Sequence, residues 1–100
     1  MKPLNSLLTL EELKDLSSRS HFRYGQAIAD AGDVQIHEKK TFRIEARVKH
    51  GDGQRRTVML ESTPNGLRWK CTCSSRKGFF CQHCVAVGLA NLAGKSKSSE

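Results

Sequence analysis

Long apolar runs are absent from this chain of 100 residues: none approaches the roughly 18 residues that a membrane-spanning helix needs. Its N-terminal segment, MKPLNSLLTLEEL, brings in acidic residues where a secretory signal peptide needs an unbroken apolar stretch. These two absences predict a cytoplasmic protein that does not contact a membrane. With 37% hydrophobic and 27% charged residues, the composition is that of one small globular domain.

Acidic residues are also missing from most of the C-terminal half. No Asp or Glu occurs between Glu61 and Glu100, whereas this interval holds the basic residues Arg68, Lys70, Arg76, Lys77, Lys95 and Lys97. Residues 1–50 carry nine Lys/Arg and seven Asp/Glu, a net charge of +2, and residues 51–100 carry eight and three, a net charge of +5. A positive field of this kind favours polyanionic partners such as nucleic acid.

Two helices are expected in the N-terminal third of the chain. In the first, Thr9 and Glu12 have capping-box spacing, and leucines recur on one side, at Leu10, Leu13 and Leu16. The second begins near Ser20 and ends at Gly32, a residue typical of helix C-termini, although Gly25 weakens the helical pattern. Its buried face is expected to contain Phe22, Ile28, Ala29 and Ala31.

The apolar period changes to two after Gly32, which indicates strands. Val34 and Ile36 alternate with polar residues, and the clearest strand follows, with an apolar face made of Phe42, Ile44, Ala46 and Val48. Turn signals at 51–53 and 64–66 bound a strand through TVML. In the next strand one face is expected to hold Leu67, Trp69, Cys71 and Cys73, and the other Arg68, Lys70 and Thr72.

The last element is a helix of small and apolar residues over about 82–93, stopped by Gly94. The sequence therefore predicts an α+β fold: a small antiparallel β-meander with two N-terminal helices and a metal-anchored C-terminal helix. Residues 1–94 are expected to form a single domain, and residues 95–100 a disordered polar tail.

All four cysteines lie in the segment CTCSSRKGFFCQHC, residues 71–84. Cys71 and Cys73 are one residue apart on a strand, so their side chains point to the same side, and Cys81 and His83 flank one residue where the last helix begins. Three thiolates and one imidazole, spaced C-x-C-x7-C-x-H, form a tetrahedral ligand set suited to Zn²⁺. The sequence predicts one zinc ion, held by Cys71, Cys73, Cys81 and His83.

Other interpretations of the cysteines rank lower. A C-x-x-C redox pair of Cys81 and Cys84 leaves the remaining candidate ligands without a purpose. Because Cys84 opens an apolar run it is assigned to the core, and an all-cysteine site with Cys84 in place of His83 is the minority alternative. A switch in which the thiolates oxidise and release zinc has no specific support in the sequence.

The zinc is expected to be structural. A catalytic zinc keeps an open position for water and normally has an acid/base group nearby, whereas here four protein ligands fill the site in a segment without Asp or Glu. The H-x-E motif of zinc deaminases is absent, because Cys84 and Val85 follow His83. We therefore expect no enzymatic activity and no small-molecule substrate.

The pattern C-x-C-x7-C-x-H, preceded by LRWKCTC and followed by CVAVGLANL, resembles the SWIM zinc finger over residues 67–93. Two positions depart from that family: Gln82 stands where Lys or a similar residue is typical, and Cys84 where an aliphatic residue is usual. The upstream segment FRYGQAIADAGDVQI resembles the region that precedes the finger in bacterial proteins, several of them Swi/Snf-type helicases. The resemblance implies a DNA-binding or protein-interaction module that tethers an associated ATPase or helicase, although the chain itself has no G-x-x-x-x-G-K-[ST] motif.

Two classes of partner follow from this. In the first, nucleic acid, with DNA favoured, is bound independently of its sequence through phosphate contacts from Arg68, Lys70, Arg76 and Lys77. The last helix is too apolar to read a major groove. In the second, the chain is a protein–protein interaction module without direct nucleic-acid contact. Phe79 and Phe80 could stack on bases, but packing over the zinc as its apolar shell is favoured.

Overall fold

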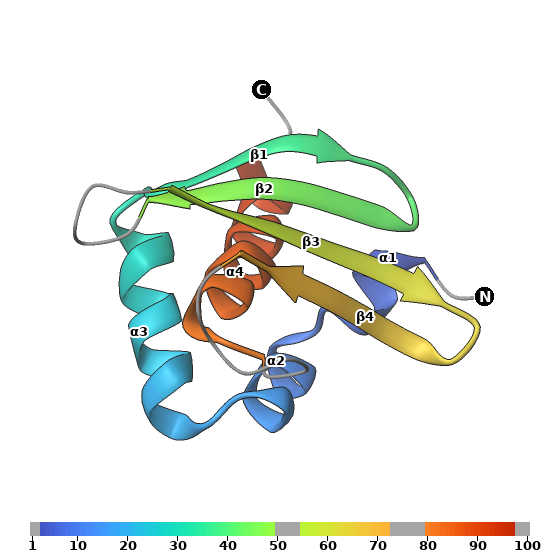
Figure 1. Ribbon diagram of the computed structural model, residues 1–100, viewed down its shortest axis with the longest axis horizontal. Helices are drawn as coiled ribbons and strands as arrows, with labels where there is room; N and C mark the ends of the chain where they lie inside the picture. Colours follow the sequence, from blue (N-terminus) through green and yellow to red (C-terminus); the bar gives the residue numbers. More distant parts are fainter. Residues whose placement is uncertain (1–2, 50–54, 73–79, 98–100) are drawn as a thin grey trace.

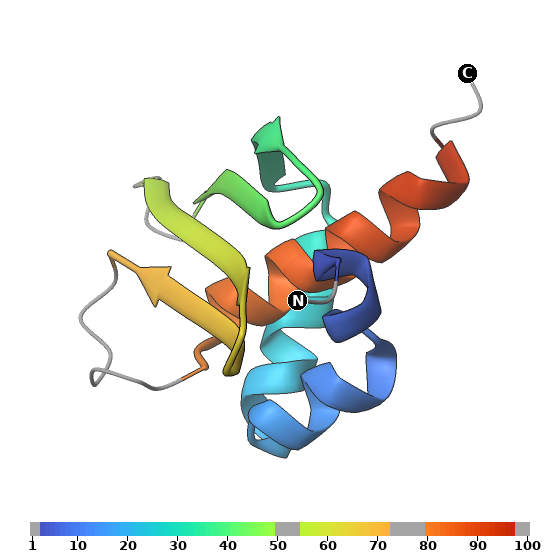
Figure 2. The ribbon, with the colours of Figure 1, turned by 90° about the vertical axis from the view of Figure 1, so that its right-hand side faces the viewer.

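The fold is a four-stranded antiparallel sheet with helices gathered on one of its faces (Figures 1 and 2). The computed structural model describes residues 3–49, 55–72 and 80–97. Its helices are α1 (Leu4–Leu7), α2 (Leu10–Leu16), α3 (Arg19–Asp30) and α4 (Gln82–Lys97). Its strands are β1 (Val34–Lys39), β2 (Arg43–Lys49), β3 (Arg55–Thr63) and β4 (Gly66–Cys71). The predicted α+β class and the predicted meander are confirmed, since the strand order is β1-β2-β3-β4 with antiparallel neighbours.

Helix α2 begins where the capping-box spacing predicts. The side chain of Thr9 accepts a hydrogen bond from the backbone N–H of Glu12 at 3.2 Å. Leu13 is fully buried, whereas Leu10, the first residue of this helix of seven, is 46% exposed. The single turn α1 was not predicted; its Leu4 is buried, and the Leu4 N–H donates to the carbonyl of Thr41 at 2.8 Å.

Helix α3 ends as its glycine predicts. Gly32 has φ of 75°, and its N–H donates to the Ala29 carbonyl while the N–H of Asp33 donates to the Ile28 carbonyl, at 3.0 and 3.2 Å. This pair of bonds is the Schellman motif, which satisfies carbonyls that the helix end would otherwise leave open. Phe22 and Ile28 pack against the core as expected. Ala31 does not, because it is the exposed C-cap residue.

Strand β2 has the predicted alternation, with Ile44, Ala46 and Val48 buried. Ala46 lies opposite Val58 of β3 and Ile44 opposite Leu60, so the apolar residues of the two strands share the face that the helices cover. Phe42 is 39% exposed, and its predicted place in this face is wrong. It precedes β2, in the turn where the Lys40 N–H donates to the Arg43 carbonyl at 2.7 Å.

Helix α4 lies against the inner face of the sheet, with α3 packed alongside it (Figure 2). Residues 83–88 are all buried, which agrees with the prediction that this helix is core. The predicted stop at Gly94 is wrong, and residues 95–97 are helical, because a glycine inside a helix costs only about 1 kcal/mol relative to alanine. Residues 98–100 of the predicted tail lie outside the described residues. Within the described ranges, no helix is long and apolar enough to cross a membrane.

Candidate metal centre

Cys71 enters the site from the sheet. It is the last residue of β4 and lies opposite Val58 of β3. Its neighbours Lys70 and Thr72 are exposed, so the alternation of the strand directs the Cys71 side chain to the covered face, where it packs against the core. This placement follows the predicted alternation of Leu67, Trp69 and Cys71 along the strand.

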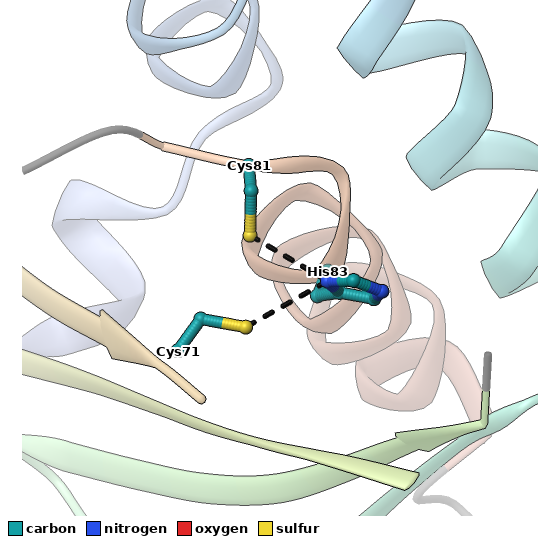
Figure 3. Close-up of side chains that lie close together, drawn as sticks. All are labelled: Cys71, Cys81 and His83. Atoms are coloured by element: carbon teal, nitrogen blue, oxygen red, sulfur yellow. Dashed lines mark hydrogen bonds between the residues drawn. The ribbon is translucent and has the colours of Figure 1, made fainter. Parts of the chain in front are cut away.

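Cys81 and His83 enter the site from the start of α4 (Figure 3). Cys81 directly precedes the helix, and His83 is its second residue. The Nδ1 atom of His83 lies 3.7 Å from the Sγ atom of Cys71 and 3.7 Å from the Sγ atom of Cys81. One imidazole nitrogen therefore faces two sulfurs that come from separate elements of the fold.

The three side chains form a compact and largely buried cluster. The Sγ atoms of Cys71 and Cys81 and a ring nitrogen of His83 all lie within 4.8 Å of one another. Cys81 and His83 are buried, at 2% and 3% exposure. Three such atoms, placed so close together, could hold one metal ion. The structure thus brings together three of the four predicted ligands, while Cys73 lies outside the described residues.

Cys84 lies beside the cluster as a core residue. It is fully buried, as predicted, and its Sγ atom is 3.9 Å from the Sγ of Cys81. A disulfide requires about 2.03–2.05 Å, so these two cysteines are not bonded to each other. Hydrogen bonds with Cys71 and Cys84 hold the pKa of Cys81 far below that of an ordinary thiol, against the opposing effect of burial.

The same contacts act on Cys84 in the opposite direction. Hydrogen bonds with Cys71 and Cys81, followed by burial, raise the pKa of Cys84 above the ordinary range.

Phe80 forms an apolar wall next to Cys81. It is 1% exposed, and its ring meets that of Trp69 edge to face, with centroids 5.1 Å apart and an interplanar angle of 88°. The burial of Phe80 confirms that this ring is packed and excludes base stacking by it, whereas its role as an apolar shell of the zinc stays a prediction. Phe79 lies outside the described residues.

Two of the four predicted nucleic-acid contacts can be located. Arg68 and Lys70 are exposed on the outer face of β4, on the opposite side of the strand from Cys71. Arg76 and Lys77 lie outside the described residues. Sequence reasoning did not assign the exposed Arg47, Lys49 and Arg55, which lie on the same outer face; the alternation of β2 was the available signal for the first two.

Comparisons with protein-family models, with curated proteins and with solved structures find no match to this chain. The resemblance to the SWIM finger therefore stays a prediction.

Proposed function

We propose that this chain is a zinc-stabilised module of the SWIM type that binds nucleic acid, with DNA favoured, through its phosphates. The main support for a bound metal ion is the distance between the sulfur and nitrogen atoms of the candidate ligands. With sulfur at about 2.3 Å and nitrogen at about 2.0–2.1 Å from a tetrahedral zinc ion, a sulfur and a nitrogen ligand are about 3.6 Å apart. The two separations from His83 Nδ1 to Cys71 Sγ and to Cys81 Sγ are both 3.7 Å.

The donor set supports zinc over hard cations. Thiolate and imidazole ligands suit zinc, whereas Mg²⁺ and Ca²⁺ are bound by oxygen. Cys73 is the proposed fourth ligand, since it follows Cys71 by two residues, the spacing that puts two strand side chains on one side. The alternative is an all-cysteine site, in which Cys84, whose Sγ atom lies 3.9 Å from that of Cys81, takes the place of His83.

The role proposed for the metal is structural. No Asp or Glu of the described residues joins the cluster, so no carboxylate stands ready as a general base. A zinc ion bound here cross-links the end of β4 to the start of α4, two consecutive elements of the chain. We propose no enzymatic activity for the chain.

Charge supports the nucleic-acid partner. The chain has a net charge of +7, and Arg68 and Lys70 are exposed and form no ion pair within the described residues. The buried position of α4 leaves it unable to enter a major groove, so the contacts proposed are to phosphates and independent of base sequence. Arg76 and Lys77 are the other two proposed contacts.

The test is a titration of labelled duplex DNA, single-stranded DNA and RNA with zinc-loaded protein at about 50 and about 200 mM salt. Binding through phosphates is expected to weaken steeply between these concentrations, by about 0.9 powers of salt for each neutralised phosphate of a duplex. The Cys73→Ser variant serves as the control with an incomplete ligand set. If no nucleic acid binds even at low salt, the protein–protein interaction module replaces this proposal.

A further inference from the structure

We propose that one corner of the outer sheet face, formed by Arg47, Lys49 and Arg55, is a docking surface for the phosphate backbone of duplex DNA. We call these three residues the basic corner. The inference rests on the proposed function and names a contact surface that lies outside the predicted set. It places the dominant contacts on β2 and β3 rather than beside the cysteines.

Strand register brings the basic corner together. Lys49 of β2 lies directly opposite Arg55 of β3, and Arg47 lies opposite Thr57. Arg47 and Lys49 are two residues apart on β2, so their Cα atoms are about 6.8 Å apart along the strand. All three basic residues are exposed, and the alternation with buried Ala46 and Val48 puts the two β2 side chains on the outer face.

The pairing of Lys49 with Arg55 is unfavourable for the isolated chain. Like charges directly opposite each other on an antiparallel pair are destabilising. Within the described residues, no carboxylate forms an ion pair with any residue of the basic corner. A bound phosphate group would neutralise this repulsion, and such an arrangement is therefore expected of a surface that meets a polyanion.

The opposite end of the same face is already neutralised. There Arg43 donates a hydrogen bond to the carboxylate of Glu45 at 2.9 Å and lies 3.7 Å from that of Glu38. His37 Nε2 lies 3.0 Å from the other oxygen of Glu45. Farther along, Glu61 is the register partner of both Arg43 and Arg68. Along β2 and β3, the outer-facing cations that form no ion pair with a described residue are therefore those of the basic corner.

The basic corner also surrounds a hollow that an anion can enter. Its three side chains line a hollow of about 150 Å³, together with Gln35 and Asp33. Asp33 is the one carboxylate among the described residues of that lining, and it leaves a net charge of +2 from three cations and one anion. Gln35 adds a side-chain amide that can donate a hydrogen bond to a phosphate oxygen.

The chemistry of the face favours a duplex over a single strand. Single-stranded nucleic acid is bound by stacking its bases on aromatic rings. The outer-facing residues of β2, β3 and β4 include no Phe, Tyr or Trp, since Trp69 packs against the core on the other side. Phosphate contacts without stacking suit a duplex, whose bases stay paired.

The basic corner is linked to the metal centre through a pair of threonines. The N–H of Thr57 donates to Thr72 Oγ1 at 2.9 Å, and the N–H of Thr72 donates to the Thr57 carbonyl at 3.1 Å. Thr57 lies opposite Arg47, and Thr72 directly follows Cys71. Arg47 of β2, Thr57 of β3 and Thr72 therefore lie side by side across the sheet, and Thr72 is the residue next to the proposed zinc ligand Cys71.

The experiment compares two triple variants of the full zinc-loaded chain on a labelled duplex of about 20 base pairs. One carries Arg47→Gln, Lys49→Gln and Arg55→Gln. The matched control, Arg19→Gln, Arg23→Gln and Lys40→Gln, removes the same three charges from exposed positions outside the corner. Anisotropy titrations over several salt concentrations give the affinity and its salt dependence.

Loss of the basic corner is expected to weaken binding at least about 30-fold at low salt and to reduce the salt slope by about 2 to 3, whereas the control changes affinity less than about threefold. The corner variant should also melt at the same or a higher temperature, because the repulsion between Lys49 and Arg55 is gone. The charge-conserving variant Arg47→Lys with Arg55→Lys should bind within about threefold of the original chain.

The outcomes separate this inference from the proposed function. If both triple variants weaken duplex binding equally, only the net charge of the chain matters. This result overturns the docking surface at the basic corner, while the proposed nucleic-acid function stands. If the original chain binds no nucleic acid at low salt, both fall together. If the corner variant melts at a lower temperature and binds weakly, its weak binding could come from a damaged fold. The charge-conserving variant then separates the two causes, and weak binding by that variant also overturns the inference.

Discussion

Gly25 on α3 lies directly against Val85 on α4. A Cβ atom at position 25 would stand 2.5 Å from Val85 Cγ1 and 2.8 Å from the backbone oxygen of Gln82, so close that the neighbouring atoms would have to shift. The two helices can approach this closely only because position 25 has no side chain. Since Gln82 and His83 begin α4, this contact also sets where the helix that carries His83 lies.

Substitution of Gly25 by alanine is expected to destabilise the fold. At an open helix position this change gains about 1 kcal/mol of helix propensity, but overpacking costs up to about 3 kcal/mol, and here the neighbours are a β-branched side chain and backbone. We expect a net loss of about 2 kcal/mol in the free energy of unfolding, measured by urea denaturation. The control is Gln26→Ala on the exposed side of α3. A Gly25→Ala variant as stable as the original would contradict the close approach.

Removal of zinc is expected to unfold at least the C-terminal half of the chain. Structural zinc contributes an apparent 10–16 kcal/mol, roughly, in small finger peptides, whereas whole domains are stable by only about 5–15 kcal/mol. Native mass spectrometry should find one zinc per reduced chain, and circular dichroism should show loss of helix and of a cooperative melt after chelation. A chelated chain with an unchanged melting temperature would remove the basis for the metal centre.

The choice of ligands can be tested by two single substitutions. His83→Ala should abolish the one-to-one zinc content, because His83 Nδ1 is the nitrogen that faces both sulfurs at 3.7 Å. Cys84→Ala should retain the zinc and lose on the order of 1 kcal/mol of stability from the small cavity left in the core. If His83→Ala retains its zinc and Cys84→Ala loses it, the site is the all-cysteine one instead.

Local signals predicted the elements of the fold whose causes are local. The capping residue Thr9, the left-handed Gly32 and the alternation within β2 each act over a few residues, and each does in the structure what its pattern indicates. Packing overrides the local signal at Gly25, which looked like a weakness of its helix and is instead the contact that lets two helices meet. The error at Gly94 has another cause: a glycine inside a helix costs only about 1 kcal/mol, so it does not by itself stop α4.

The same division holds for the candidate site. The short spacings Cys71-x-Cys73 and Cys81-x-His83 were enough to predict one set of ligands, and three of the four come together. The basic corner could not be predicted from composition, which pointed to the C-terminal half. Its charges meet only through the pairing of β2 with β3, and the partner of each residue depends on the register between these two strands.

Trp69 should report on the metal centre by its fluorescence. It is the only tryptophan, and its ring packs on Phe80, the residue that directly precedes Cys81. Within the described residues its Nε1 atom is buried and has no hydrogen-bond partner. Release of Cys81 from zinc should loosen Phe80 and expose the indole N–H to water, so a chelator titration should shift Trp69 emission to longer wavelength as zinc is lost.

The Phe80→Ala variant provides the matched test of this coupling. Truncation of a fully buried phenylalanine costs about 3–5 kcal/mol, and it removes the ring between Trp69 and Cys81. The emission of this variant should already be red-shifted with zinc bound, and chelation should change it less than in the original chain. Emission that stays constant while native mass spectrometry shows the zinc leaving would mean that the metal does not hold Phe80 against Trp69.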